Sequence, residues 1–468
     1  MPPEIVTEIP PGPLTLEDRA SIRKQVLLLA WPVVIQSLMR TMMFLVDTTL
    51  LGHYGEKGAK ADHALAATGV LQPISNTLVM VLSALGTGAL AIVARAKGEG
   101  DVKKQEREAA TAVVAGLALG LLVLPLSLVG LPAIARLLSD DPATASTASG
   151  FLFWMSLAMP FVLLEIVGSS ALRGAGDTRM PMVFALIANV LNGIGNWILI
   201  FGKFGAPEMG VVGAGLSTSI CLTLQGLMTL AWMHTRGSAV RLRWSAYAQV
   251  GRESLVRLAR VTVPAVIEPL LLQVGFLIFI HTMASLGSVA MAAHRTAVSI
   301  ESIAFMPGYG LSIACGALVG QCLGAKRPDL AEEGFRVSAR LSLWVMGTLG
   351  VIFFVAGRPM VSLLAHDASD AVKDGAALCL KVSAFELPGL ALAMVLGGAL
   401  RGAGDTKSPL IVALIGVWLI RVPLSYVAAI PMKLGLYGAW LTMVVDWGAR
   451  AGVFWILWKR GRWKTLKL

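Results

Sequence analysis

Residues 171–181 read ALRGAGDTRMP, and residues 399–409 read ALRGAGDTKSP. Nine of the eleven positions are identical, at an offset of 228 residues. The tripeptide GAL, at 88–90 and again at 316–318, repeats at the same offset. Self-similarity at one long, fixed offset indicates that the chain consists of two related halves.

The composition indicates a membrane protein. Of the 468 residues, 56% are hydrophobic and 14% are charged, unlike the average soluble domain. Apolar runs of roughly 20 residues, the length that crosses a bilayer, recur along the chain. We predict twelve spans, at 26–51, 64–92, 109–137, 148–172, 182–202, 211–234, 258–284, 289–322, 338–365, 377–400, 409–431 and 434–458. The eighth is longer than one crossing needs, and we expect Pro307-Gly308-Tyr309-Gly310 to break it. The predicted fold class is therefore an all-α integral membrane protein with twelve transmembrane helices.

The placement of positive charge gives the orientation. The net charge is +11. If both termini face the cytoplasm, 27 of the 39 Lys and Arg residues fall in cytoplasmic loops and tails, and eight fall in external loops. This asymmetry is the positive-inside bias. We therefore expect both termini in the cytoplasm, and no nucleic-acid partner.

The two halves set the domain organisation. We predict a disordered cytoplasmic tail (1–24), an N-terminal six-helix half (25–235), a cytoplasmic linker (236–257) and a C-terminal six-helix half (258–468). Because each half has an even number of spans, both copies enter the membrane from the same side. Such parallel repeats are related by an axis along the membrane normal, and the expected substrate site is the cleft between them.

Cofactors and nucleotide chemistry are not expected. The four cysteines lie within spans, without paired spacing or histidine partners, and are expected to be packing residues; they are Cys221, Cys315, Cys322 and Cys379. We therefore predict no metal centre and no cofactor. The sequence contains no Gly-rich GK[ST] loop, so we expect an ion gradient rather than ATP to supply energy, and no enzymatic activity.

The repeated RGAGDT motif falls in the turns after the fourth and the tenth predicted spans. An arginine at a helix C-terminus suits the carbonyl end of the dipole, glycine accepts left-handed φ there, and an Asp-Thr pair can cap the next helix. We predict a structural turn at each copy, with a hinge between helices as the alternative. The residues of this motif are Arg173, Gly174, Gly176, Asp177, Arg401, Gly402, Gly404 and Asp405.

Three further stretches make a family resemblance specific: VDTTLLGHYG at 46–55, AAHRTAVSIESIAFMPGYG at 292–310 and GALVGQCLGA at 316–325. Together with the twelve spans and the repeated turn, they resemble the multidrug and toxic compound extrusion (MATE) family. The resemblance covers the chain after residue 20. It implies a cation-coupled antiporter of the bacterial inner membrane that exports small amphipathic, often cationic compounds. Its expected partners are H⁺ or Na⁺, membrane lipid and the exported compound, and we expect a monomer.

An ionisable group inside a span is a functional candidate because it costs roughly 2.5–3.5 kcal/mol at the helix centre. Asp47 is the first such candidate, and Arg40 lies seven residues earlier on nearly the same helical face. In the resembled family, the aspartate of the VDT motif couples a cation to transport. The resemblance implies that role for Asp47, where Na⁺ would be only a transient ligand. The alternative is that Asp47 caps a helix or pairs with Arg40.

Two asparagines in the fifth span extend this candidate site. Asn192 and Asn196 are four residues apart and share a helical face. Their amides suit a cation or a hydrogen bond to Asp47. Many members of the resembled family carry an aspartate where Asn196 stands, so the N-terminal half of this chain is expected to hold a single titrating carboxylate. The alternative is hydrogen bonding between helices alone.

We expect the substrate-binding residues to lie mainly in the C-terminal half. Glu268 lies between two prolines of the seventh span, and such irregular backbone is typical of a helix that lines a cavity. Glu301 matches the glutamate of the family's IES stretch, with a salt bridge to Arg295, Arg40 or Arg421 as its alternative. The remaining candidates are Gln273, His294, and the flexible Met42 and Met43 beside Asp47, for which ordinary packing is the alternative.

Other ionisable residues in the spans are expected to be structural. Arg295, Arg450 and Asp446 lie near predicted span ends, where long side chains can reach the interface. Glu165 and Glu386 have no counterpart in the other half.

Two other functions compete with export. An intramembrane aspartyl protease uses a GxGD motif and needs two facing aspartates at membrane depth, but both GAGD copies lie in charged cytoplasmic turns. A flippase for lipid-linked precursors, with a related twelve-helix architecture, is the main alternative. The mechanism we favour is alternating access, in which the two halves rock against each other.

Overall fold

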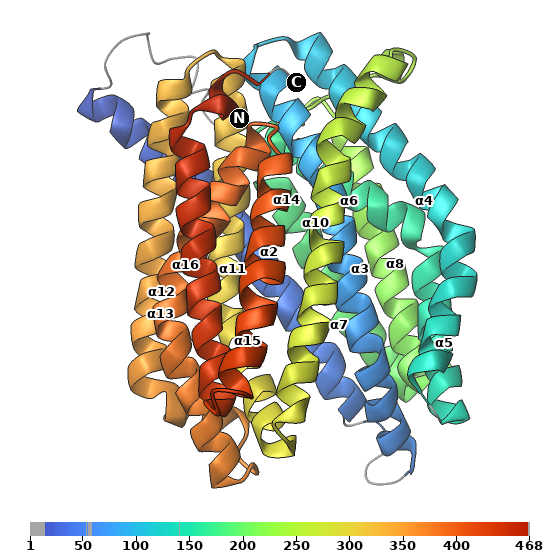
Figure 1. Cartoon of the computed structure of the whole chain (residues 1–468). Coiled ribbons are helices and arrows are strands. Elements are labelled where there is room, and N and C mark those ends of the chain that lie inside the picture. The colour runs from blue at the N-terminus through green and yellow to red at the C-terminus, as the bar shows by residue number, and fades with distance from the viewer. Residues whose placement is uncertain (1–14, 53, 55–58, 140, 467–468) are drawn as a thin grey trace. The chain divides into compact units, whose positions relative to one another are not determined.

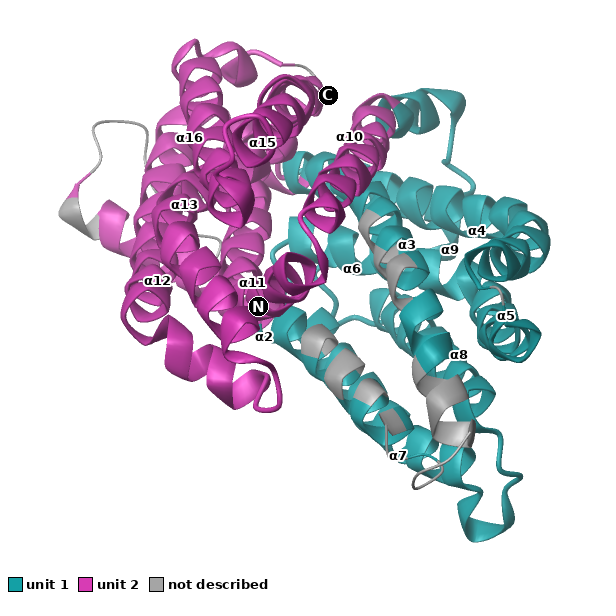
Figure 2. Ribbon diagram, turned by 60° about the horizontal axis from the view of Figure 1, so that its bottom comes forward, with its two compact units in different colours: residues 1–2, 35–96, 101–259 teal, residues 3–34, 97–100, 260–468 magenta. Residues whose placement is uncertain are grey.

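The computed structural model describes residues 15–52, 54, 59–139 and 141–466, and helices are the regular elements found there (Figure 1). The chain divides into two compact units (Figure 2). Of the described residues, unit 1 holds those within 35–96 and 101–259. Unit 2 holds those within 15–34, 97–100 and 260–466.

The six predicted spans of the N-terminal half are all helical. Their helices are α2 (Leu16–Gly52), α3 (Ala59–Gly98), α4 (Val102–Leu138), α5 (Pro142–Leu157), α6 (Met159–Gly174), α7 (Arg179–Phe201) and α8 (Gly210–Met233). The helices α5 and α6 together occupy the fourth predicted span, and the chain bends by 54° between them. The break lies beside Pro160 in the first turn of α6. Proline has no N–H to continue the hydrogen-bond ladder of α5, which accounts for the bend.

The six predicted spans of the C-terminal half are helical as well. They are α10 (Arg252–Ser285), α11 (Ser288–Gly324), α12 (Pro328–Leu364), α13 (Asp370–Gly402), α14 (Lys407–Leu414) continued by a π-helix (Ile415–Arg421) and α15 (Val422–Ala429), and α16 (Gly435–Lys459). In the described part of the chain ten helices are long and apolar enough to cross a membrane, and the bent α5–α6 pair makes an eleventh. α16, which contains Asp446 and Arg450, occupies the twelfth predicted span. The protein is a twelve-helix membrane protein of two six-helix copies.

Two expectations about helix boundaries were wrong. The Pro307-Gly308-Tyr309-Gly310 stretch does not break the eighth span, because α11 runs without interruption through Pro307. Neighbouring helices in a membrane protein compensate for the hydrogen bond that a proline removes.

Part of the predicted disordered tail (1–24) is helical, because α2 already begins at Leu16. Thr15 and Asp18 form a reciprocal capping box: the Thr15 N–H donates to the Asp18 carboxylate at 2.8 Å, and the Asp18 N–H donates to Thr15 Oγ1 at 3.2 Å. This motif satisfies free N–H groups at a helix start. Residues 1–14 of the tail lie outside the described residues.

The polar linker after α8 packs against unit 1. It contains the short helix α9 (Trp244–Tyr247), and Leu242 is buried with residues of α4 and α6. Gln105 on α4 donates a hydrogen bond to the Ala239 carbonyl at 3.1 Å, and Arg243 lies 3.6 Å from Glu106. The segment between the two copies is thus attached to the N-terminal copy rather than extended in solvent.

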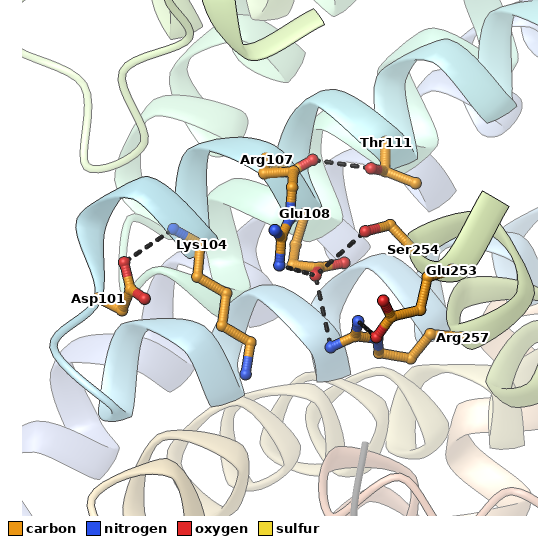
Figure 3. Close-up of polar contacts among 8 residues, drawn as sticks. All are labelled: Asp101, Lys104, Arg107, Glu108, Thr111, Glu253, Ser254 and Arg257. Carbon is orange, nitrogen blue, oxygen red and sulfur yellow. Dashed lines mark hydrogen bonds and ion pairs between the residues drawn. The ribbon is translucent and has the colours of Figure 1, made fainter. Parts of the chain in front are cut away.

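The attachment continues into the first turns of α10. Figure 3 shows Glu108 on α4 facing Ser254 and Arg257. The Ser254 hydroxyl donates to Glu108 Oε1 at 3.5 Å, and Arg257 lies 3.6 Å from the same oxygen. Glu108 is 1% exposed. Unit 1 accordingly extends to Ala259, beyond the predicted end of the linker.

Candidate functional site

The two copies of the RGAGDT motif fold into the same turn. In unit 1, the Asp177 N–H donates to the Leu172 carbonyl at 2.9 Å, and the Gly176 N–H donates to the Arg173 carbonyl at 3.0 Å. The φ angle of Gly176 is +95°. This is the Schellman pattern, in which glycine ends a helix in the left-handed region. Unit 2 repeats both bonds at the same lengths, with Asp405 and Gly404 as the donors, and the φ angle of Gly404 is +89°.

The aspartate of each turn caps the following helix. Asp177 accepts a hydrogen bond from the Met180 N–H at 3.1 Å, and Asp405 accepts one from the Ser408 N–H at 3.0 Å. The predicted capping role belongs to the aspartate alone, since the side chain of Thr178 makes no cap bond. Each turn thus ends one helix and starts the next with its own polar atoms.

The first glycine of each motif lies against the other repeated tripeptide. A Cβ atom built on Gly174 would lie 2.6 Å from the Leu90 carbonyl oxygen on α3, and one built on Gly402 would lie 2.0 Å from the Gly316 carbonyl oxygen on α11. Leu90 and Gly316 belong to the two GAL stretches. The two sequences that repeat at one offset are therefore in contact in each unit, where only glycine fits.

The arginine of each motif binds the first helix of its own copy. Arg173 donates to Gln36 Oε1 on α2 at 2.8 Å within unit 1. Arg401 donates to Glu268 Oε1 on α10 at 2.5 Å within unit 2. Glu268, which was predicted to bind substrate, is thus paired with the turn motif of its own copy.

A sequence signal for this pairing existed. PVVIQ at 32–36 aligns with PAVIE at 264–268, at an offset of 232 rather than 228. Gln36 and Glu268 are therefore equivalent positions, just as Arg173 and Arg401 are. The change of offset hides this equivalence from a search at a single period.

The polar site of unit 1 is built by α2, α7 and α8. The Asn196 amide nitrogen donates hydrogen bonds to Asp47 and, at 3.2 Å, to Asn192 Oδ1. Asn192 and Asn196 are fully buried, and Asp47 is partly buried. The Asn196 Oδ1 atom has no hydrogen-bond partner among the described side chains. The three residues predicted to form one cation site thus form one hydrogen-bonded group.

Helix α8 supplies a further hydrogen-bond partner to this group. The Asn192 amide nitrogen donates to Thr218 Oγ1 at 3.1 Å. With the Asn192 amide turned over, its nitrogen lies 3.1 Å from Asp47 Oδ1 and its oxygen accepts from Thr218. Either asparagine can therefore donate to the carboxylate. The side chain of Arg40, the predicted alternative partner of Asp47, lies outside the described residues.

Unit 2 contains a buried charged cluster. Arg450 donates from Nε and Nη2 to the two Asp446 oxygens at 2.6 and 2.8 Å, and Arg421 Nε lies 2.7 Å from Asp446 Oδ2. Both guanidinium groups lie over the Trp447 ring, at 5.6 Å for Arg421 and 4.5 Å for Arg450. Asp446 and Arg450 are 0% and 5% exposed. The expectation that they extend to the membrane interface was wrong.

Two glutamates lie near this cluster. Glu386 on α13 is within electrostatic reach of Glu301 on α11 and of Arg421. One oxygen of each glutamate is buried without a hydrogen-bond partner among the described residues. Arg295, an alternative partner predicted for Glu301, is exposed. Glu301 also lies within electrostatic reach of Arg421, which is one of the arginines predicted as its alternative partner.

The other predicted substrate residues differ in burial. His294 is 2% exposed and packs edge-on between Phe279 and Trp440, with both ring centroids 5.7 Å away. Gln273 is partly buried on α10. In unit 1, Met42 is 58% exposed on α2, and Met43 is partly buried next to it.

Comparison with known proteins places these features in one family. A sequence model of the MatE family matches residues 32–198 and 264–427. The probable multidrug resistance protein NorM of Thermotoga maritima is 30% identical over 458 residues, which cover 96% of this chain and 95% of that protein. The uncharacterized transporter YisQ of Bacillus subtilis is 26% identical, covering 93% and 94%.

Solved structures share the fold. A structure described as the outward-facing conformation of a multidrug resistance MATE family transporter of the MOP superfamily superposes with a TM-score of 0.87. It is 20% identical and covers 96% of this chain and 97% of its own. A MOP superfamily transporter from Pyrococcus furiosus gives a TM-score of 0.86 at 21% identity, covering 94% and 96%.

Proposed function

Because the chain belongs to the MatE family, the multidrug and toxic compound extrusion transporters, we propose that it is a cation-coupled antiporter. It exports small amphipathic, often cationic compounds from the cytoplasm by alternating access of its two six-helix copies. The family relatives named as multidrug resistance proteins support export of toxic compounds. The single observation that carries the coupling proposal is the hydrogen bond between Asn196 and Asp47.

Asp47 is proposed to be the coupling residue. A carboxylate in a membrane span is costly, by roughly 2.5–3.5 kcal/mol at the helix centre, and persists where it has a function. Binding H⁺ or Na⁺ relieves that cost. The Asn196 Oδ1 atom, an acceptor without a partner among the described side chains, is available to a bound Na⁺ or to a protonated Asp47. Asn192 completes the proposed site.

Substrate contacts are proposed in both copies. Met42 and Met43 offer flexible apolar surface near Asp47, and Met surfaces adapt to varied ligands. In the C-terminal copy, Glu301 offers a carboxylate for a cationic compound. His294 lies seven residues earlier on the same helix, α11, and Gln273 lies on α10. Glu268 is left out of this set because Arg401 already neutralises it.

The free energy of the ion gradient limits how far such an exporter can concentrate its substrate. If one proton exchanges for one monovalent cation, no net charge moves, so only the pH difference drives export. That difference supplies about 1.4 kcal/mol per pH unit, a tenfold accumulation. An exported neutral compound would also gain about 2.3 kcal/mol per 100 mV of membrane potential. The location that fits is a bacterial inner membrane with both termini cytoplasmic, and we propose a monomer.

Transport by purified protein in liposomes tests the coupling role of Asp47. A fluorescent cationic dye is enclosed, and a pH gradient and a Na⁺ gradient are imposed separately on wild type and Asp47→Asn. The exposed carboxylate variant Asp370→Asn is the matched control, since its side chain is 84% exposed. We expect one gradient to drive dye movement in wild type and the control, and neither gradient to do so in Asp47→Asn.

Two outcomes would contradict the proposal. Transport by Asp47→Asn at the wild-type rate would remove Asp47 from coupling. No dye movement in the wild type under either gradient would favour a lipid flippase, which a lipid-scrambling assay on the same liposomes would then test.

A further inference from the structure

The arginine contacts of the two repeated turns carry an inference that rests on the proposed transport function. We propose that Gln36 and Glu268 are positioning residues that attach the first helix of each copy to the RGAGDT turn of the same copy. Through this attachment the part of the first helix that lies in the same unit, from Ile35 onward in α2 and from Arg260 onward in α10, moves together with its own copy during transport. Neither residue contacts substrate or the coupling ion.

The first argument is that the contact occurs twice with different chemistry. Gln36 accepts from Arg173 at 2.8 Å, and Glu268 accepts from Arg401 at 2.5 Å. The partners are 137 residues apart in one copy and 133 in the other. The contact is therefore present in both copies, although the spacing of its partners differs and the acceptor is a neutral amide in one copy and a carboxylate in the other. What the two copies share is the geometry rather than the charge.

The second argument is that each arginine lies at a helix end that is fixed on another side as well. The glycine that follows it packs against the second helix of the same copy, where a Cβ on Gly174 or Gly402 would clash with a backbone carbonyl. The turn is thus joined to the first helix by the arginine and to the second helix by the glycine. Three segments meet at one point in each unit.

The third argument is burial. Gln36 is 6% exposed and Glu268 is 8% exposed, so an apolar replacement of either one leaves an arginine without that buried acceptor. Removing one partner of such a contact has a larger effect than exchanging it for another acceptor. Variants that exchange the acceptor for another acceptor, and variants that remove it, therefore distinguish a positioning role from substrate recognition.

Steady-state transport of a cationic dye distinguishes these roles. We expect Glu268→Gln and Gln36→Glu, which convert each copy to the chemistry of the other, to keep turnover and KM within about twofold of wild type. We expect Glu268→Leu and Gln36→Leu to lower turnover at least about tenfold with KM unchanged, the loss expected for a hydrogen bond to a charged group. A raised KM for the cationic dye in Glu268→Gln would overturn the proposal in favour of substrate binding.

Hydrogen–deuterium exchange in detergent gives a readout that does not depend on transport. The amides of Asp177 and Asp405 close the two turns. We expect them to exchange roughly tenfold faster in the leucine variant of their own copy, and at the wild-type rate in the other copy. The control Glu386→Leu removes a buried carboxylate from α13, the helix of Arg401, and should leave the Asp405 amide unchanged.

The two readouts separate failure of this proposal from failure of antiport. Unchanged exchange in both leucine variants would overturn the positioning role, whatever the dye does. Faster exchange in the leucine variants, found together with a wild type that transports no dye, would support the attachment and remove only the proposed antiport.

Discussion

At the scale of single residues, two glycines hold backbone conformations that other residues adopt with strain. Gly176 and Gly404 have φ of +95° and +89°, in a region that residues with a Cβ atom avoid. We expect Gly176→Ala and Gly404→Ala each to lower the free energy of unfolding by about 1–2 kcal/mol. Thermal unfolding of the purified protein in detergent measures this loss.

Gly452 in α16 is the matched control for these variants. A Cβ atom added there meets no atom of the described residues within 4 Å. Alanine is favoured over glycine inside a helix by up to about 1 kcal/mol, so Gly452→Ala should be neutral or stabilising. An equal loss at all three glycines would mean that left-handed φ is not the cause.

Residue roles could be predicted where they are local in sequence. The capping by Asp177 and the left-handed φ of Gly176 follow from positions within one turn. The partners of the neighbouring arginines did not follow, because Gln36 and Glu268 are more than 130 residues away. Glu268 looked like a free carboxylate for that reason, and only the folded chain reveals its partner.

At the scale of elements, the linker depends on one buried carboxylate. Glu108 on α4 is 1% exposed and faces Arg257 and Ser254 (Figure 3). We expect Glu108→Ala to lower the free energy of unfolding by about 1–3 kcal/mol, because it leaves buried polar groups without their acceptor. Limited proteolysis of the linker, together with thermal unfolding, reports this change.

Glu253 is the control in the same cluster. It pairs with Arg257 at 3.0 Å, but its side chain is 91% exposed. Exposed pairs contribute at most about 1 kcal/mol, so Glu253→Ala should leave the linker as resistant as in the wild type. Equal sensitivity of the two variants would show that burial of Glu108 is not what attaches the linker.

Most elements could be predicted from the sequence because membrane spans depend on composition and length. All twelve predicted spans overlap helices. The two wrong predictions concern the effect of a proline and the start of a helix, which hydropathy does not determine. The helix is broken beside Pro160 but continues through Pro307. Helix packing decides between these outcomes, and it cannot be read from a local stretch of sequence.

At the scale of the whole molecule, the two copies share a turn but differ in their polar sites. Unit 1 holds Asp47 with two asparagine amides, whereas unit 2 holds Asp446 between two arginines. The sequence could predict the first site through its family resemblance. The sequence could not predict the second site. Arg421 lies in the π-helix and Asp446 and Arg450 lie in α16, so these side chains come together only when the chain folds. Gly416 makes this approach possible, since a Cβ there would lie 2.1 Å from Arg450 Nε.

This asymmetry predicts different losses from the two copies. We expect Glu301→Gln to keep gradient-driven transport while raising KM for a cationic dye about tenfold, equivalent to about 1.4 kcal/mol of lost binding. A neutral dye should keep its KM and serves as the internal control. Loss of coupling in Glu301→Gln, with both KM values unchanged, would place the coupling site in the C-terminal copy instead.

The most direct test of the central claim, that substrate and a cation compete through Asp47, is ion release on substrate binding. Purified protein in weakly buffered detergent is titrated with tetraphenylphosphonium while a pH indicator and a Na⁺-sensitive electrode record release. The account predicts that wild type releases H⁺ or Na⁺ as the compound binds, and that Asp47→Asn binds the compound without releasing either ion. Equal ion release by Asp47→Asn, or binding by the wild type with no release at all, would contradict it.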